Sequence, residues 1–288
     1  MIKFCASKLL FYATLAKKSC IYLQEFDFLP YFTAAIYRTN MLKKERQAFI
    51  LHNVNLHNKV LSSDLSSAIN VSEDTIRRDL QELSDHGKLI KVHGGALSKS
   101  FHSSFNTSKV YAIENKKKIA QKAAGLIKDG MFVLTSGGTT IIELAKALPE
   151  NLHATFITGS LPAALEYMHH PNIEVIIIGD KLSKSSQITV GGEAISQIRQ
   201  LKADICFVGT NALEVNSGLM DNDWEVVQVK KAMIEASAKV VSLAISEKLN
   251  TTQRIKVCDI KDIDVLITEL DGVAPVLEPY KNAGLQIL

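Results

Sequence analysis

Two adjacent arginines, Arg77 and Arg78, are the side chains whose types and spacing most directly suggest a chemical task. Neighbouring residues project about 100° apart on a helix. One guanidinium can therefore enter a major groove and pair with guanine while the other binds a phosphate. The alternative is that the pair only belongs to the solvated, charged face of an ordinary surface helix.

The residues around this pair predict a helix that begins at Ser72. The serine hydroxyl can accept a hydrogen bond from a first-turn amide, and Glu73 and Asp74 place negative charge at the positive end of the helix dipole. With 3.6 residues per turn, the apolar residues Ile76, Leu80 and Leu83 share one face. The opposite face carries Asp74, Thr75, Arg78, Gln81 and Glu82, with Arg77 at its flank. One face is expected to pack and the other to read DNA.

The preceding residues predict a partner helix. Residues 62–69 form a short amphipathic pattern with a serine cap, and Asn70 and Val71 interrupt it before the second helix. Two helices joined by such a short turn are typical of a helix-turn-helix. A further helix is expected over residues 43–53, with Phe49 and Ile50 pointing inward, and Val60 is expected in a short strand.

The following residues predict a wing. Gly87 ends the second helix, residues 89–92 are typical of a strand, and residues 93–95 form a tight turn before a return strand at 96–97. Residues 41–97 are therefore predicted to form a winged helix-turn-helix domain.

From Met131 onward, apolar strands alternate with helical patterns, and several strands are apolar on both faces. This alternation predicts a doubly wound, mostly parallel α/β sensor domain over residues 116–288, after a linker at 98–115 that begins with a serine-rich stretch. Residues 116–118, three lysines, are expected to be the solvated start of a helix that ends at Gly130, and the alternative is a second nucleic-acid-binding patch. The strands are expected at 131–135, 154–158, 173–178, 205–209, 240–244 and 265–268, and the other helices at 139–148, 162–170, 192–201 and 225–236.

Several loops that follow strands have the composition of an anion site. Ligands of doubly wound sheets bind outside the carboxyl ends of the strands. Residues 136–140 pass from a strand into a helix, their glycines permit close approach, and a helix N-terminus offers free amides. Residues 158–160 repeat this arrangement, and Gly191, Gly192 and residues 209–211 add polar backbone. Tight turns with capping threonines are the alternative explanation, but several converging loops favour a phosphate site.

Two motifs at fixed spacing carry a family resemblance: V-S-x-x-T-I-R-R-D-L at residues 71–80 and G-x-L-I-x-V-H-G-G-A at residues 87–96. They resemble the DeoR/GlpR family of bacterial transcription regulators. The resemblance implies that the second helix touches operator DNA and that the wing lies on the DNA backbone. Pattern and resemblance together give the expected DNA contacts: Ser72, Thr75, Arg77, Arg78, Gln81, Lys91, His93 and Gly94.

The resemblance continues over about residues 116–270, which are similar to the sensor module of that family. It implies a fold like that of ribose-5-phosphate isomerase and a phosphorylated sugar as effector. The family's D-x-G-T-T, T-N-S and V-K-x-A-M segments have counterparts at residues 136–140, 158–160 and 229–233. The effector contacts expected from these segments and the loops are Ser136, Gly137, Gly138, Thr139, Thr140, Thr158, Gly159, Ser160, Lys230 and Lys248.

Some positions depart from the family pattern. Ser136 stands where an acid is usual, Val226 stands where a glutamate is expected, and Ile245 replaces an aspartate in the segment that keeps Lys248. An isomerase needs a carboxylate to move a proton between carbons. Binding survives the loss of acids better than turnover does, so a regulator that is not an enzyme is favoured. A sugar-phosphate isomerase or deaminase fused to a DNA-binding module is the alternative.

Composition limits the remaining possibilities. The chain has 288 residues, 47% of them apolar, which suits about two globular domains. Its four cysteines have no short paired spacing, so neither a disulfide framework nor a cysteine zinc site is expected, and a reducing cytoplasm fits. His169 and His170 lack a third metal ligand at useful spacing. No metal, cofactor or catalytic constellation is predicted.

Residues 1–40 differ from the rest, with many aromatics and no clean period. Lys3 and Lys8 precede an apolar run, as in a signal peptide, but Lys17 and Lys18 interrupt that run. No stretch reaches the roughly 18 apolar residues of a membrane span. We interpret this segment as an extension without function, ahead of a second start at Met41.

The charge distribution suggests more than one copy of the chain. Residues 41–99 carry nine basic and seven acidic side chains, whereas residues 100–288 carry 19 and 21. The sign suits DNA binding, but the excess of two is small. A second copy doubles the number of neutralised phosphates, so a homo-oligomer, dimer or tetramer, is expected on operator DNA.

Overall fold

The structure is a computed structural model, and it describes residues 41–99 and 110–288. The predicted extension at 1–40 and residues 100–109 of the predicted linker lie outside this range. Within the described ranges, no helix combines the length and the apolar character needed to cross a bilayer.

The N-terminal region has the predicted winged helix-turn-helix architecture. Its three short strands form an antiparallel sheet in the order β1-β3-β2. The central strand β3 pairs with β2 in the wing and with β1, which directly precedes the helix-turn-helix. The elements are α3 (Lys43–His57), β1 (Lys59–Leu61), α4 (Ser62–Ile69), α5 (Glu73–Asp85), β2 (Ile90–Val92) and β3 (Gly95–Leu97).

Local sequence explains most boundaries of these elements. Asn70 ends α4 in the left-handed conformation, at φ 53°, and so makes the turn to α5. Ser72 is the N-cap of α5 and accepts from the Thr75 amide at 3.3 Å, which confirms the predicted start. Two predictions were inexact: α3 continues four residues past residue 53, and Ser62 is a buried first residue of α4 rather than its cap.

The expected apolar face of α5 lies in the core of this region. Ile76, Leu80 and Leu83 are buried against Ile50 of α3, and Phe49 packs at the edge of the same cluster. Each fully buried aliphatic side chain stabilises the fold by roughly 1.5–3 kcal/mol. This packing leaves the opposite face of α5 free for another task.

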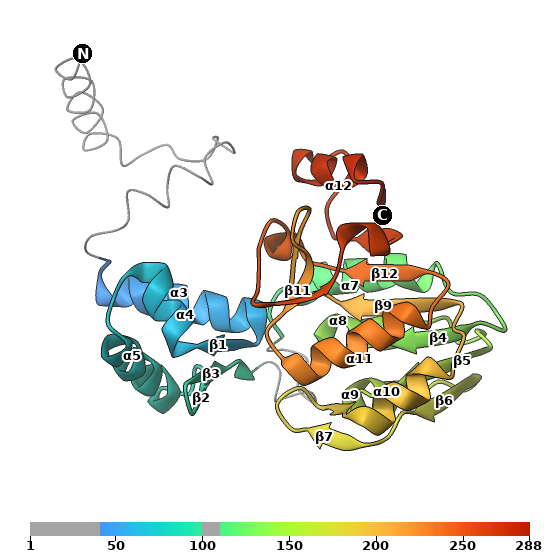
Figure 1. Cartoon of the computed structure of the whole chain (residues 1–288), viewed down its shortest axis with the longest axis horizontal. Helices are drawn as coiled ribbons and strands as arrows, with labels where there is room; N and C mark the ends of the chain where they lie inside the picture. The colour runs from blue at the N-terminus through green and yellow to red at the C-terminus, as the bar shows by residue number, and fades with distance from the viewer. Residues whose placement is uncertain (1–40, 100–109) are drawn as a thin grey trace, which may run out of the picture. The chain divides into compact units, whose positions relative to one another are not determined.

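The C-terminal region is built on a seven-stranded parallel sheet in the order β15-β14-β12-β9-β4-β5-β6 (Figure 1). From β4 the chain adds β5 and β6 on one side, and it then returns to β9 and adds β12, β14 and β15 on the other side. The topological switch point therefore lies between β4 and β9. The strands are β4 (Phe132–Thr135), β5 (Ala154–Thr158), β6 (Ile173–Ile177), β9 (Ile205–Gly209), β12 (Val240–Leu243), β14 (Val265–Ile267) and β15 (Gln286–Ile287).

Helices cover both faces of this sheet, as the doubly apolar strands predict. In β4, Val133 belongs to one apolar cluster and its neighbour Leu134 to the other, because side chains alternate along a strand. The cluster on one face includes residues of α7 (Ile113–Ala124), α8 (Thr139–Lys146) and α9 (Leu161–Tyr167). The cluster on the other face includes residues of α10 (Gly192–Arg199) and α11 (Trp224–Glu235), which lie together in Figure 1.

Short antiparallel elements at the ends of the sheet were not predicted. They comprise a hairpin, β7 (Lys181–Ser183) with β8 (Ile188–Val190), and a three-stranded sheet of β10 (Ala212–Glu214), β11 (Gly218–Asp221) and β13 (Ile255–Cys258). Strands of three or four residues give no readable alternation. A short C-terminal helix, α12 (Glu278–Asn282), was also missed.

The helix over the three lysines differs from its prediction in two ways. Helix α7 ends at Ala124 instead of near Gly130, although Ile127 is still buried. Lys116 is buried rather than solvated, and its Nζ donates to the Tyr111 carbonyl at 2.6 Å. Only Lys117 and Lys118 have the expected exposure.

The wing offers a test of this fold. A Cβ at Gly95 would lie 1.9 Å from the Val60 carbonyl oxygen, on the backbone of the paired strand. We expect Gly95→Ala to lower the free energy of unfolding by about 3 kcal/mol, because a backbone clash cannot relax cheaply. Urea unfolding measures this, with Gly272→Ala as a control, since a Cβ there meets no atom within 4 Å. Equal stability of the two variants would contradict the β1–β3 pairing.

Candidate functional site

The exposed face of α5 carries both arginines, and only one of them forms ion pairs. Arg77 forms ion pairs with Glu73 at 3.3 Å and with Asp74 at 3.1 Å, all within its own helix. Arg78 is exposed and forms no ion pair within residues 41–99 and 110–288. Surface pairs of this kind contribute little to stability, so Arg77 can exchange its partners for phosphates at small cost.

The wing lies beside this face. Lys91 donates from Nζ to Gln81 of α5 at 2.9 Å, and Gln81 donates in turn to Asp85 at 2.7 Å. His93 and Gly94 are exposed at the wing's tip, where Gly94 has φ 75° and open space around it. Ser72 and Thr75 are joined by their hydroxyls at 2.9 Å. The contact between Lys91 and Gln81 thus links the predicted DNA contacts of helix and wing, and their contact with DNA stays a prediction.

A cavity lies at the carboxyl ends of β4 and β9, the switch point of the parallel sheet. The two loops that follow these strands approach closely: a Cβ at Gly209 would lie 2.8 Å from the Gly137 carbonyl oxygen. Sheets of this type bind ligands at such a point. The cavity's polar lining includes Gly137, Gly138, Thr139, Thr140, Ser185, Ser186, Gly209, Thr210, Asn211, Asp221, Asn222, Asp223, Lys230 and Lys248, and it also includes His57, Asn58 and Lys59.

One side of this cavity offers hydrogen-bond donors. Gly138 is the N-cap of α8, at φ 116°, and no side chain caps this helix. The amides of Ile141 and Ile142 bond to the Gly138 carbonyl, so the amides before them are the ones left without a helical partner. Such a terminus attracts an anion through its amides and its dipole.

Four of the predicted effector residues do not line the cavity. Ser136 is buried and accepts from the Gly209 amide at 2.8 Å, which holds the two central loops together. Thr158 donates to the Thr135 carbonyl at 2.9 Å, and Ser160 caps α9. Gly159 approaches Thr189 so closely that a Cβ there would lie 2.4 Å from its Oγ1. These residues shape the loops, and their contact with an effector stays a prediction.

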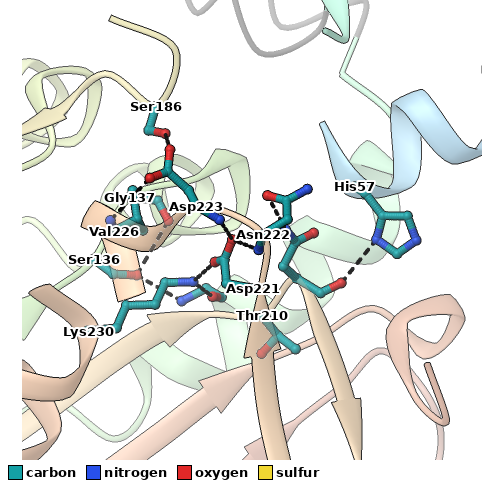
Figure 2. A network of polar contacts seen from close by, with 12 residues as sticks. His57, Ser136, Gly137, Ser186, Thr210, Asp221, Asn222, Asp223, Val226 and Lys230 are labelled. Atoms are coloured by element: carbon teal, nitrogen blue, oxygen red, sulfur yellow. Dashed lines mark hydrogen bonds and ion pairs between the residues drawn. The ribbon is translucent and has the colours of Figure 1, made fainter. Parts of the chain in front are cut away.

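Lys230 is fixed by a buried ion pair at the floor of the site. Its Nζ donates to Asp221 Oδ2 and to the Gly209 carbonyl, each at 2.7 Å (Figure 2). Burial alone raises the pKa of Asp221. The Lys230 ammonium and hydrogen bonds from the Asn222 amide and the Asn211 side chain outweigh this and lower that pKa overall. Asp221 is therefore a carboxylate at neutral pH and accepts only.

Lys248 supplies a second amino group, whose pKa is unusually low. Its Nζ donates to the Thr210 carbonyl at 2.7 Å. Burial, together with the ammonium groups of Lys116 and Lys230, lowers the pKa of Lys248 to about 7. An anion in the cavity would stabilise the charged form of this lysine.

The acidic side of the cavity was missed by sequence reasoning. Asp221, Asn222 and Asp223 end β11 and begin α11, and Asp223 caps that helix by accepting from the Glu225 and Val226 amides. The D-N-D segment before a predicted helix was a readable cap signal. The position of this segment beside the loop after β9 could not be predicted, because it depends on the short antiparallel pair of β10 and β11.

The two cavity carboxylates are already engaged. Asp221 holds Lys230, and Asp223 accepts from two amides and, at 3.0 Å, from the Ser186 hydroxyl (Figure 2). A general base needs a free lone pair within reach of the proton it removes. This arrangement suits binding better than proton transfer.

Other sequence candidates take no part in this cavity. Within the described part of the chain, no cluster of His, Cys, Asp or Glu could hold a metal. His170 lies 2.6 Å from the Pro149 carbonyl through Nε2. Trp224, the first residue of α11, is 66% exposed and is not part of the cavity lining.

Two hydrogen bonds join the cavity to the end of α3 and the start of β1. Burial, with Lys248 nearby, lowers the pKa of His57 to about 4, so its imidazole is neutral. Nδ1 of His57 lies 3.3 Å from the Asn211 carbonyl and must carry the proton to donate (Figure 2). Asn222 donates from Nδ2 to the Lys59 carbonyl at 3.1 Å.

Two family models match the chain. A model described as "DeoR-like helix-turn-helix domain" matches residues 46–101, and one described as "DeoR C terminal sensor domain" matches residues 111–270. Together they include the α5 face, the wing and the cavity.

Curated relatives match over most of their length. HTH-type transcriptional regulator GolR of Listeria innocua is 31% identical over 250 residues, which is 86% of this chain and 98% of that protein. HTH-type transcriptional regulator GlpR of Haloferax volcanii is 32% identical over 251 residues, with the same shares. The glycerol-3-phosphate regulon repressor of Escherichia coli is 26% identical over 249 residues, 86% of this chain and 99% of that protein.

Solved structures are more distant. Ribose 5-phosphate isomerase A of Methanocaldococcus jannaschii aligns with a TM-score of 0.34 and 23% identity, over 46% of this chain and 53% of that chain. A likeness at this level carries no argument about function.

The buried pair at the cavity floor gives a prediction about stability. Lys230→Met leaves Asp221 buried without its cation, so we expect a loss of about 3–5 kcal/mol in the free energy of unfolding at pH 8. Without the ammonium, burial raises the pKa of Asp221 above its unfolded value. The penalty is therefore present above that raised pKa and disappears as the carboxyl takes up a proton at lower pH.

Urea unfolding of both proteins between pH 5 and pH 8 measures this dependence. Lys231→Met, one position along the same helix, is the matched control, because Lys231 forms no ion pair within residues 41–99 and 110–288. A loss that is equally large at pH 5 would show that the missing packing of the lysine stem, rather than the unpaired carboxylate, is responsible.

Proposed function

The chain belongs to the DeoR family of helix-turn-helix transcriptional regulators, and we propose that it represses carbohydrate-metabolism genes until a phosphorylated sugar releases it from its operator. Proteins of this family are DNA-binding regulators and are generally not enzymes. The observation that carries the effector part of the proposal is the cavity at the switch point, where an uncapped helix N-terminus meets Lys230 and Lys248.

The DNA part of the proposal rests on the free face of α5. Arg78 forms no ion pair in the described structure, and it lies one residue from Arg77, which is held by Glu73 and Asp74. Arg78 is therefore ready for a base edge, where a guanidinium can bind guanine bidentately, and Arg77 suits a phosphate. The small positive excess of this region favours two or more copies of the chain on one operator.

The effector part rests on charge and hydrogen bonding in the cavity. The amides at the start of α8 suit a phosphate, and Lys230 and Lys248 in the lining of the same cavity can add positive charge. Both carboxylates in the lining are engaged, which supports binding without turnover. Relatives named as repressors of a glycerol-3-phosphate regulon are consistent with a phosphate ester as ligand.

The link between the two parts is the pair of hydrogen bonds to His57 and Lys59. An effector regulates only if it binds the DNA-competent and incompetent arrangements with different affinities. Asn211 and Asn222 line the cavity and also bond to the His57 side chain and the Lys59 carbonyl. A ligand that moves either asparagine changes these bonds, which supplies such a difference.

Substitution of the arginines tests the DNA part. We expect Arg78→Ala to lower operator affinity by about 1–3 kcal/mol and to relax the preference at one base pair. Arg77→Ala should weaken binding to all sequences alike and reduce the salt slope by about one. Fluorescence anisotropy with promoter fragments from the source genome, between 50 and 200 mM salt, measures both effects.

Arg199→Ala is a matched control, because this exposed arginine belongs to α10 and pairs with Glu235. Wild-type affinity and salt dependence in both α5 variants would refute the assignment of this face to DNA. The same measurement with added sugar phosphates tests release.

Proton uptake tests the effector part. At pH 8, Lys248 is mostly neutral because its pKa is about 7, and a bound phosphate dianion raises that pKa. Binding should therefore take up as much as one proton per site. Calorimetry of glycerol 3-phosphate, ribose 5-phosphate and fructose 6-phosphate, in two buffers with different ionisation enthalpies, measures this number.

We expect Lys248→Met to abolish the uptake and to weaken binding, whereas the exposed Lys128→Met should leave both unchanged. Binding of any of these esters without proton uptake in the wild-type protein would place the phosphate away from Lys248. Absence of binding by the wider class of sugar phosphates would refute the proposed effector.

A further inference from the structure

We propose that the surface formed by α9 and the edge strand β6 binds the same surface of a second copy of this chain, and that the two sheets join through antiparallel pairing of β6 with its copy. This surface shares no residue with α5 or with the cavity lining, so the proposal goes beyond the proposed function. It places the contact between copies, which the small charge excess of the DNA-binding region leaves open.

The first observation is an open strand edge. β6 is the last strand of the parallel sheet and, in the described part of the chain, pairs only with β5 (Figure 1). Natural proteins protect such edges with charges, above all lysine, or with proline, a bulge or a very short strand. The opposite edge strand, β15, has only two residues. β6 has five residues, a regular register, no lysine or proline, and a single charge, Glu174. Its edge is therefore poorly protected against another strand.

The second observation is a concentration of exposed apolar side chains. Among the described residues, five of the ten large apolar side chains that remain exposed belong to α9, its C-cap and β6. They are Leu161, Leu165, Met168, Ile176 and Ile177. Residues 161, 165 and 168 form one stripe along the helix, because spacings of four and seven residues return to the same side. Scattered apolar residues are normal on a surface, but a group of this kind marks an interaction site.

The α9 stripe faces the open edge rather than the neighbouring helix. On the opposite flank of α9, a carboxylate oxygen of Glu166 lies 3.9 Å from Nζ of Lys146 of α8, so that flank faces α8. Tyr167 points into the core. The remaining flank, which carries Leu161 and Leu165, therefore lies on the side where β6 ends the sheet.

The backbone of β6 sets the register of the proposed pair. The Ile178 amide bonds to the Thr158 carbonyl of β5. Backbone groups alternate in direction along a strand, so those of Ile173, Val175 and Ile177 point to the open side. Two antiparallel copies that meet at Val175 place Ile173 opposite Ile177 of the other copy. Each facing pair can then exchange two hydrogen bonds, and every outward group of the strand is satisfied.

Charge favours this register over its neighbours. With its centre at Val175, the pairing places Glu174 opposite Ile176 of the other copy. A centre at Glu174 would set the two carboxylates directly opposite each other, which is destabilising. A shift the other way would leave Ile173 beyond the end of the partner strand. The antiparallel contact is also symmetric, so it closes after two copies.

The spacing of the layers fits a pair of helices above this seam. α9 contacts both β5 and β6, and neighbouring strands lie about 4.8 Å apart. Two sheets joined at β6 would therefore hold α9 and its copy roughly 10 Å apart on the same face, close to the usual packing distance of helices. The apolar stripe of one copy then covers that of the other. Because the strand, its charge and the helix all match themselves, a second copy is the occupant that this surface fits.

Sedimentation velocity of the full chain without DNA tests the interface. We expect the wild-type protein to be a dimer at micromolar concentration. Leu165→Lys should raise the dissociation constant of the dimer by about tenfold or more, because it buries a charge without a partner. Ile177→Pro should have the same effect, because it removes an outward N–H that β5 does not use, and an edge strand tolerates proline at such a position.

Val273→Lys is the matched control, since this exposed valine lies outside the proposed surface, and it should remain dimeric. Circular dichroism and thermal unfolding confirm that each variant is folded.

A cysteine at the proposed centre tests the register. Val175→Cys should cross-link to its own copy under mild oxidation, because the Cα atoms of a facing hydrogen-bonded pair lie about 5.5 Å apart, within the range of a disulfide. Glu174→Cys should not, because its copy is displaced by two residues along the strand, beyond the reach of about 7 Å. The wild-type protein, treated in parallel, corrects for cross-links of the native cysteines.

Several results would overturn the proposal. They are a monomeric wild-type protein, a wild-type dissociation constant in both Leu165→Lys and Ile177→Pro, and a dimer in which Val175→Cys forms no cross-link. A monomer whose outward β6 amides resist hydrogen exchange would show that another part of the chain covers this edge. The proposed function fails separately: a dimer that ignores promoter DNA and sugar phosphates contradicts that function but leaves the interface standing, whereas a monomer that binds them does the reverse.

Discussion

The buried ion pair between Lys230 and Asp221 is the interaction on which the rest of the site depends. It joins three elements of one stretch of the chain, since Lys230 comes from α11, Asp221 ends β11, and Lys230 also bonds to the last carbonyl of β9. Burying two charges costs nearly as much as their attraction returns, so this pair contributes orientation more than stability. Its carboxylate then positions the Asn211 side chain and the Asn222 amide.

The same arrangement supports the proposal that the cavity binds a charged ligand without performing chemistry on it. The start of α8 and the two lysines contribute donors to the lining, and every carboxylate of the lining has a structural partner. Catalysis requires interactions with the ligand that are stronger in the transition state than in the ground state. Under the proposed function, a site whose acids are all held by lysine, amides and a hydroxyl would bind its ligand and act on the bonds at His57 and Lys59.

The sequence predicts α5, the wing and the buried strands of the parallel sheet because their signals are local: Ser72 caps, Ile76 and Leu80 keep the helical period, and the buried strands are continuously apolar. The acidic side of the cavity could not be predicted. Asn211 and Asp221 meet only because β10 and β11, of three and four residues, return the chain to the end of β9. The burial of Lys116 escaped prediction for a similar reason, since a run of three lysines normally faces water.

The pairing of Arg77 with Glu73 and Asp74 has a consequence for how the protein moves along the genome. A guanidinium held by its own carboxylates is a weaker attractor for an arbitrary phosphate, because those contacts must first be exchanged. If Arg77 contacts phosphates as proposed, even the small cost of this exchange shortens non-specific residence, and a repressor that leaves wrong sequences sooner samples more of them per unit time. The two acidic residues beside Arg77 would thus favour a rapid search for the operator over tight non-specific binding to DNA.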